Sequence, residues 1–114
     1  MTSSSATGLL HLVYFYPREG TDDATRKAEA AKLVQGCLDH LTGIPDVLRL
    51  LVATPAGTPR DVVDNAYAVA LLVEFADQAA HDRYQDHPDH HRFIEMCHGF
   101  WSRVQVYDSL VTQG

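Results

Sequence analysis

Cysteine is scarce in this chain, and its scarcity argues against a fold held together by disulfides. The 114 residues contain two cysteines, Cys37 and Cys97, which lie far apart within stretches of helical pattern. Neither belongs to a CxxC or to another spacing typical of a metal site. Because disulfide frameworks are rare in reducing compartments, two isolated cysteines favour a cytoplasmic protein.

Basic residues and long apolar runs are scarce as well. Nine Lys and Arg residues stand against fifteen Asp and Glu residues, the net charge is −6, and the basic residues form no cluster. Binding to nucleic acid is therefore disfavoured. The chain lacks the run of roughly 18 apolar residues that a membrane span needs, so we expect no membrane association. Residues 1–8 lack the basic and apolar regions of a secretory signal, and we expect a disordered lead-in there, followed by one domain at 9–110.

Four short stretches have the composition of β-strands. Residues 9–16 are rich in aromatic and aliphatic side chains and stop at Pro17; the other three stretches are 47–53, 67–75 and 101–107. In the first stretch His11, Val13 and Phe15 share one face, because side chains alternate along a strand. Both faces of the strands are largely apolar, so each face of the sheet must be covered by something.

Three stretches show the spacing of amphipathic helices. The first covers residues 23–41, after a candidate cap at Thr21 or Asp22 and before Gly43. The second runs from the cap Asp77 to about residue 86, and the third begins at Pro88. The apolar stripe expected on the first helix consists of Ala24, Ala28, Ala31, Val34, Cys37 or Leu38, and Leu41.

The order strand, helix, strand, strand, helix, helix, strand predicts an α+β, ferredoxin-like fold, β-α-β-β-α-α-β, with a four-stranded antiparallel sheet. Helices would cover one face of this sheet and leave the other in water. An exposed apolar face of that size marks an interaction surface, and a second copy of the chain is the simplest partner. We therefore predict a homodimer joined through Leu10, Leu12, Tyr14, Leu72, Trp101 and Tyr107.

The stretch richest in reactive side chains is His87-Pro88-Asp89-His90-His91. Pro88 is suited to the first turn of a helix, which places His90 and His91 near a helix start, where the local field favours a neutral imidazole. His90 lies three residues before Phe93 and should share its buried side, whereas His91 should point to solvent. The alternative is that all of these histidines are solvated surface residues at a helix junction.

With this order of elements, the chain resembles the stress-responsive A/B barrel (Dabb) domains over residues 11–108. The features that carry the resemblance are the opening strand from His11, Gly43-Ile44-Pro45, the strand at 67–75, Tyr84 with the His87-Pro88-Asp89-His90 motif, and the closing Phe100-Trp101 and Tyr107-Asp108. The resemblance implies a homodimer whose two sheets form one barrel. It does not imply a single activity, because this fold hosts many functions.

Within that family the chain is similar to plant polyketide cyclases of the olivetolic acid cyclase type, which close a linear polyketide thioester by an intramolecular aldol condensation. By position, this similarity makes His90 the general base, Tyr84 a residue that holds the substrate, and His11 a further site residue. Two pocket residues of those enzymes, a histidine and a tyrosine, correspond to Val69 and Cys37. The substrate expected here is therefore a different one, held by fewer polar groups of the pocket.

The pocket predicted between the helices and the sheet would be lined by Val13, Val34, Cys37, Val69, Leu71, Phe93, Met96, Val104 and Val106, with Leu38 nearby. An apolar slot with a few polar groups is typical of a site for a small apolar or polyketide-like molecule. An ordinary α+β core with satisfied polar groups has the same pattern, so a non-enzymatic dimeric protein for stress tolerance or ligand binding is the alternative function.

We expect no metal and no cofactor. The chain has no glycine-rich phosphate loop and no flavin motif. A metal site built from His87, His90 and His91 is disfavoured, because Pro88 interrupts the helix after His87 and adjacent helical residues diverge by about 100°. The remaining histidines of the helices, His40, His81 and His98, have the pattern of helix-surface residues, and no role is predicted for them.

Overall fold

The structure is a computed structural model that describes residues 8–113, so the predicted lead-in lies outside the described residues except for Gly8. Its elements follow the predicted order. They are β1 (Leu9–Tyr16), α1 (Asp23–Leu41), β2 (Arg49–Ala53), β3 (Val69–Phe75), α2 (Gln78–Asp86), α3 (Pro88–Cys97), a short 3-10 turn (His98–Phe100) and β4 (Arg103–Leu110).

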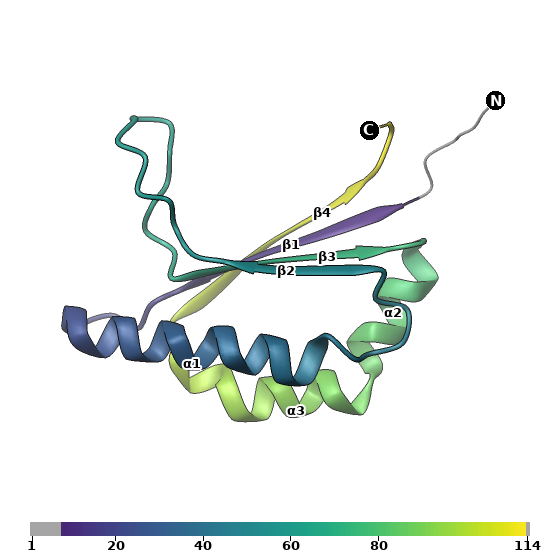
Figure 1. The fold of residues 1–114 in the computed structure, drawn as a ribbon, viewed down its shortest axis with the longest axis horizontal. Coiled ribbons are helices and arrows are strands. Elements are labelled where there is room, and N and C mark those ends of the chain that lie inside the picture. Colours follow the sequence, from purple (N-terminus) through teal and green to yellow (C-terminus); the bar gives the residue numbers. More distant parts are fainter. Residues whose placement is uncertain (1–7, 114) are drawn as a thin grey trace.

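The four strands form one antiparallel sheet in the order β2-β3-β1-β4. Helices α1 and α3 lie side by side beneath one face of this sheet, and α2 stands at one end of it (Figure 1). No helix of the described chain lies against the opposite face (Figure 1). The predicted α+β, ferredoxin-like arrangement is therefore confirmed.

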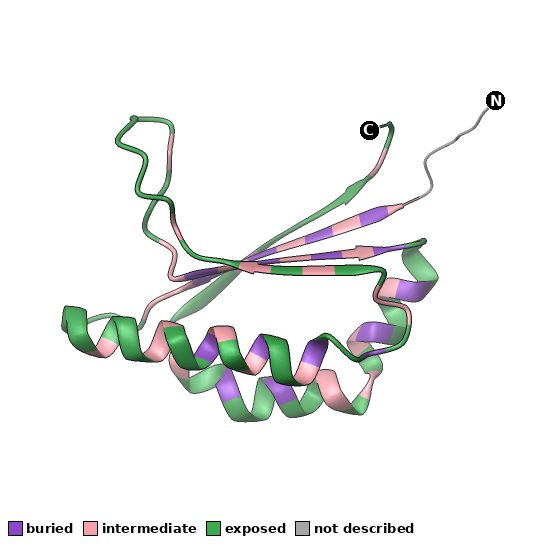
Figure 2. Cartoon of the chain, viewed as in Figure 1, coloured by how far each residue is buried: buried purple, intermediate pink, exposed green. Residues whose placement is uncertain are grey.

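The core lies between the sheet and the helices. Along β1 and β3 buried residues alternate with half-buried ones, and the buried set of β1 is Leu9, His11, Val13 and Phe15 (Figure 2). This alternation follows from the two-residue period of a strand and identifies the face that the helices cover. The half-buried residues on the other face are largely apolar too, which leaves that face without a cover in a single chain.

Helix α1 has the predicted bounds, but it is rotated slightly from the predicted stripe. Asp22 caps its start, since the Asp22 carboxylate accepts a hydrogen bond of 2.8 Å from the backbone N–H of Thr25. The buried residues are Leu33, Cys37 and Leu41, at a spacing of four. Leu38, expected to cover the pocket, is 45% exposed, and this expectation was wrong. Leu33, which lies outside the predicted stripe, is completely buried.

The contact between α1 and α3 depends on the absence of a side chain at Gly36. A Cβ atom at this position would lie 2.5 Å from the Sγ of Cys97 and 3.7 Å from the Cε1 of Phe93. Both cysteines are free and buried. Burial, with a smaller contribution from the nearby Cys97, raises the pKa of the Cys37 thiol to about 12. The Cys97 thiol packed against Gly36 thus sets how closely the two helices approach each other.

The junction between α2 and α3 follows the predicted break at Pro88. His87 ends α2, since its backbone N–H donates to the Tyr84 carbonyl, and it also caps α3. Its Nδ1 accepts a hydrogen bond of 3.0 Å from the backbone N–H of Asp89. His87 is therefore occupied by a capping role, and His90 falls in the first turn of α3.

Three strands begin later than predicted: β2 at Arg49 rather than at residue 47, β3 at Val69 rather than at residue 67, and β4 at Arg103. The last of these also changes the face of a predicted interface residue. β4 begins at Arg103 rather than at residue 101, so Trp101 precedes the strand and does not follow its alternation. The Trp101 ring lies 4.8 Å from that of Phe15 and stacks at 6.0 Å on that of Phe93. Trp101 consequently belongs to the helix-covered side and is not part of the open face on which the sequence placed it.

Candidate functional site

A pocket of about 250 Å³ lies on the helix-covered side of the sheet, next to α2 and α3. Strands β1, β3 and β4 form its floor, and the two helices supply its wall. Its lining is mainly apolar, with a few polar groups that come from β1, α2 and α3. The lining residues are His11, Val13, Phe15, Leu41, Leu71, Tyr84, Gln85, His90, Phe93, Ile94, Trp101, Val104 and Val106.

His90 and Tyr84 face each other across the junction of the two helices. Their ring centroids are 4.9 Å apart, in an edge-to-face arrangement. Burial, with smaller contributions from the neighbouring His11, His91 and His81, lowers the pKa of His90 to about 4. The His90 imidazole is therefore neutral at neutral pH and can accept a proton. His91, one residue on, is exposed and does not line the pocket.

The Tyr84 hydroxyl is buried, and it has no hydrogen-bond partner in the part of the chain that the structure describes. The residue is 1% exposed, and its ring also packs against Phe75 at 4.9 Å. Burial raises the pKa of Tyr84, so the phenol stays protonated. A buried donor without a partner is costly, which makes this hydroxyl available to an acceptor on a bound molecule.

His11 is held by a carboxylate on the neighbouring strand. β1 and β4 pair so that His11 lies directly opposite Asp108, and the His11 Nδ1 is 2.5 Å from the Asp108 Oδ1. Burial lowers the pKa of His11, while the hydrogen bond to Asp108 acts in the opposite direction. The amide nitrogen of Gln85 lies 3.4 Å from the other ring nitrogen of His11. Asp108 and Gln85 together fix the ring and leave its edge on the pocket.

His81 was predicted to be a surface residue, and this was wrong. Its side chain is 12% exposed, and its ring centroid lies 5.0 Å from that of His11 and 5.6 Å from that of Phe75. It stands three residues before Tyr84 on α2, so both side chains point the same way from the helix. That three-residue spacing from Tyr84 is a sequence signal that places His81 on the buried side of α2.

The pocket contains part of the predicted apolar lining. Val13, Leu71, Phe93, Val104 and Val106 line it. Four further residues do not. Val34 lines a different hollow, Cys37 and Val69 are completely buried in the core, and Met96 is 60% exposed.

The misplacement of Met96 has a geometric cause. On α3 the buried side is marked by Phe93 and Cys97, and the pocket lies on the side of His90 and Ile94, which are one helical turn apart. Met96 projects from the other side of the Phe93 row. The spacing of His90 and Ile94 could have identified Ile94 from the sequence, whereas Gln85 and Trp101 carried no such signal.

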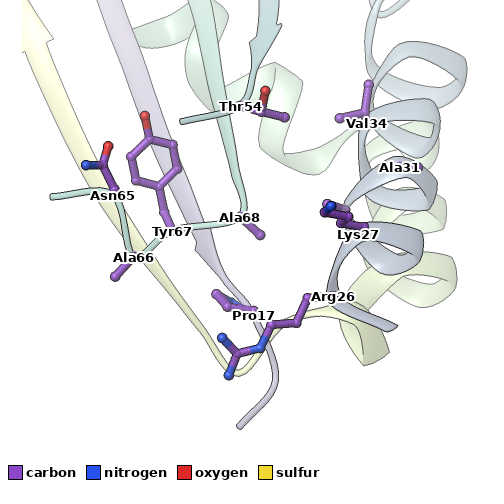
Figure 3. A pocket seen from close by; sticks show the side chains of 11 residues that line it. Pro17, Arg26, Lys27, Ala31, Val34, Thr54, Asn65, Ala66, Tyr67 and Ala68 are labelled. Carbon is purple, nitrogen blue, oxygen red and sulfur yellow. The ribbon is translucent and has the colours of Figure 1, made fainter. Parts of the chain in front are cut away.

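A wider hollow, of about 580 Å³, opens between α1 and the loop that precedes β3 (Figure 3). Arg26, Lys27 and Val34 project toward it from α1, opposite Tyr67 and Asn65 (Figure 3). Its lining includes no histidine or carboxylate from the described chain, so it lacks an acid–base pair. The other lining residues are Pro17, Ala30, Ala31, Thr54, Ala66 and Ala68. The smaller pocket, with its histidines and tyrosine, is the stronger candidate for a site of chemistry.

Among the described residues, no helix combines the length and apolar character that crossing a lipid bilayer requires.

Comparison with known proteins gives one family and many similar folds. The family model described as the stress responsive A/B barrel domain (Dabb) matches residues 9–111. None of the curated proteins compared with the chain matches it. Among solved structures, a dimeric protein of unknown function with a ferredoxin-like fold from Bacteroides fragilis has a TM-score of 0.77 at 14% identity, covering 95% of this chain and 100% of its own.

Two further structures extend this comparison. A dimeric ferredoxin-like protein of unknown function from Jannaschia sp. is 27% identical, with a TM-score of 0.64 and coverage of 91% of this chain and 99% of its own. The hydroxynitrile lyase from Passiflora edulis has a TM-score of 0.69 at 13% identity, covering 96% of this chain and 97% of its own. At such low identity, the likeness to the lyase concerns the fold alone.

Proposed function

Because the chain belongs to the stress-responsive A/B barrel (Dabb) domain family, we propose that its pocket is the active site of a small polyketide-cyclase-like enzyme. The reaction is an intramolecular aldol-type ring closure with His90 as the general base. One observation carries the proposal: His90, Tyr84 and His11 converge on one mainly apolar pocket. A neutral imidazole beside a protonated phenol supplies a base and a hydrogen-bond donor to the same bound molecule.

The residues divide the reaction between them. His90 takes the proton from a carbon between two carbonyl groups, and the resulting enolate attacks a second carbonyl carbon of the same chain, forming the new C–C bond. The Tyr84 hydroxyl donates a hydrogen bond to that carbonyl oxygen as negative charge develops on it. The proton on His90 then passes to the alkoxide, which leaves the imidazole neutral again. His11, held by Asp108, orients the substrate from the floor of the pocket.

The low pKa of free His90 is compatible with this role. It keeps the imidazole unprotonated before the substrate binds. An enolate forming beside the protonated ring stabilises that ring, because opposite charges at short range favour the charged form. The apolar walls, formed by Val13, Leu71 and Val106 among others, keep water away from this ion pair.

The alternative is a dimeric protein that binds a small apolar ligand or serves stress tolerance without turnover. The apolar lining of the pocket favours ligand binding in either case. The two functions differ only in whether the His90 imidazole moves a proton.

The assembly that we propose with this function is a homodimer in which two copies pack their open sheet faces together. Leu51 and Tyr107 are 46% and 55% exposed on this face, and the Tyr14 ring lies 6.2 Å from that of Tyr107. Such a face resembles the large apolar interfaces of obligate homodimers. The dimeric state described for the Jannaschia protein supports this arrangement.

The experiment separates binding from turnover by using Trp101, the one tryptophan of the chain, which lines the pocket. Its fluorescence reports ligands in a screen of linear β-polyketide thioesters, and mass spectrometry detects cyclised products of those that bind. His90→Ala should lower the rate of cyclisation by about 10²–10⁴-fold while binding persists, and Tyr84→Phe should also slow it. His91→Ala, which changes an exposed histidine next to the base, serves as the matched control.

Binding without any turnover would replace the cyclase by the ligand-binding function. Equal loss of activity in His90→Ala and His91→Ala would show that the effect does not come from a base in the pocket.

A further inference from the structure

A cluster of three ligating side chains lies where β1, β4 and α2 meet, beside the proposed active site. It consists of His11, His81 and Asp108, and one ligand atom of each lies within 4.8 Å of the others. The His11 Nδ1 is 2.5 Å from one carboxylate oxygen of Asp108, and the His81 Nε2 is 3.8 Å from the other. We infer that this cluster binds a divalent transition-metal ion such as Zn²⁺ through two imidazoles and one carboxylate.

His81 is prepared for this role. Its Nδ1 lies 3.1 Å from the carboxylate of Asp82. We assign the ring proton to Nδ1, where it donates to that carboxylate. The Gln78 amide nitrogen also lies 3.1 Å from this Nδ1, but it donates to the Asp82 carboxylate as well, at 3.0 Å. Because a charged acceptor makes the stronger hydrogen bond, the Asp82 carboxylate favours the His81 tautomer that carries its proton on Nδ1. The other nitrogen, Nε2, therefore carries a lone pair directed into the cluster. A carboxylate behind a ligating imidazole is the usual outer partner of a zinc-bound histidine.

The lone pair of His81 Nε2 has no satisfactory partner in the described chain. The atom is buried and accepts no hydrogen bond there. Asp108, at 3.8 Å, is too distant for a hydrogen bond and has no proton to donate when ionised. A buried acceptor left unpaired is costly. A cation placed between the two side chains satisfies both at once.

His11 completes the site by exchanging one partner for another. Without metal, its Nδ1–H donates to Asp108, and its Nε2 accepts from the Gln85 amide. With metal, the ion takes the place of the proton between Nδ1 and Asp108, and the proton resides on Nε2. The Gln85 amide then turns its oxygen toward that N–H, so the outer partner of His11 is kept in both states.

The geometry and the charge fit such an ion. Bonds of about 2.0–2.2 Å to nitrogen and oxygen separate ligand atoms by about 3–4 Å. The spacing of 3.8 Å between His81 and Asp108 lies within that range. The spacing of 2.5 Å between His11 and Asp108 is that of a hydrogen bond and must widen when the ion replaces the proton. Two neutral imidazoles and one carboxylate leave one positive charge on a divalent ion. The imidazoles are 7% and 12% exposed and Asp108 is 41% exposed, so the ion has a path from solvent and room for a water ligand.

This site differs from the histidine motif at 87–91, and its test does not depend on the proposed ring closure. The test titrates Zn²⁺ into untagged, metal-free protein by calorimetry and records the absorption spectrum with Co²⁺ as a coordination probe. We expect one ion per chain and a melting temperature that rises with Zn²⁺, because an ion that binds only the folded state stabilises it. His81→Ala and Asp108→Asn should each weaken binding at least 10-fold, and Asp82→Asn should weaken it about 10–100-fold through the outer partner.

His98→Ala and His91→Ala are the matched controls, because both remove an exposed histidine outside the cluster. Melting curves recorded in EDTA establish that each variant is folded. If His81→Ala does not fold, Asp108→Asn, which changes a partly exposed side chain, still tests whether the cluster binds the ion. Wild-type affinity in Asp108→Asn, absence of binding by the wild type, or loss of binding in His91→Ala would each overturn the inference.

Discussion

Replacing Gly36 by alanine tests the contact that sets the distance between α1 and α3. The added Cβ would meet the Sγ of Cys97 at 2.5 Å, a distance that Cβ atoms essentially never show, so something must shift. Sulfur here belongs to a short side chain buried between the helices, with little freedom to move away. The strain must therefore pass to α3, which carries Phe93 and His90 to the pocket.

The expected change in the free energy of unfolding of Gly36→Ala is the difference between two opposing effects. Alanine in a helix interior is favoured over glycine by about 1 kcal/mol. Overpacking a tight core costs about 1–3 kcal/mol. If the cost here is about 2 kcal/mol, the free energy of unfolding of the variant falls by a net of about 1 kcal/mol. For a domain of this size, that loss lowers the melting temperature by about 4 °C.

The assay is a double-mutant cycle with Cys97→Ala, measured by thermal and urea unfolding at one protein concentration. Removing the sulfur opens the space that the methyl group added by Gly36→Ala needs, so the double variant should be more stable than the sum of the single changes by about 2 kcal/mol. Gly43→Ala is the matched control, because nothing lies within 4 Å of its added Cβ. If Gly36→Ala stabilises the protein by its helix propensity alone and the cycle is additive, the close contact does not exist in solution.

Three further predictions concern the open sheet face and His90. Leu51→Glu places a charge on the exposed sheet face and should convert the proposed dimer to a monomer in light scattering. Val62→Glu, which changes an 80% exposed position outside the strands, should leave the assembly unchanged. A wild-type protein that is already monomeric would contradict the proposed dimer. His90 should titrate with a pKa of about 4 in NMR, below the ordinary 6.5, and a value near 6.5 would show that it is not buried. Because folding lowers the pKa of His90, this residue contributes stability that is present above pH 6.5 and is lost as the pH falls toward about 4. His90→Asn removes the titrating group, so the free energy of unfolding should depend less on pH in that window.

Much of the fold was predictable because its signals are local. The bounds of α1 follow from the cap at Asp22 and from the Gly43-Ile44-Pro45 stop, and the start of α3 follows from Pro88. The helix-covered face of β1 follows from strict alternation. The family resemblance identified His90, Tyr84 and His11, which the structure places around one pocket, and their catalytic roles stay a prediction.

Other features could not be predicted because they depend on rotations and on register. A rotation of α3 by a fraction of a turn exchanges Met96 for Ile94 at the pocket, and periodicity alone does not fix that angle. The later start of β4 moves Trp101 from the open face to the pocket. A single residue of slip in a strand reverses every side chain after it.

The sequence by itself determined the order of the elements, the histidine motif at a helix start and the two-sided apolar strands, since each depends on neighbours within a few residues. Only the tertiary structure decided that His11, His81 and Asp108 meet. Asp108 lies opposite His11 because β4 pairs with β1 in one register, and His81 reaches them because α2 stands at the end of the sheet (Figure 1). Contacts between residues so far apart in the chain are set by the packing of whole elements, which no local pattern encodes.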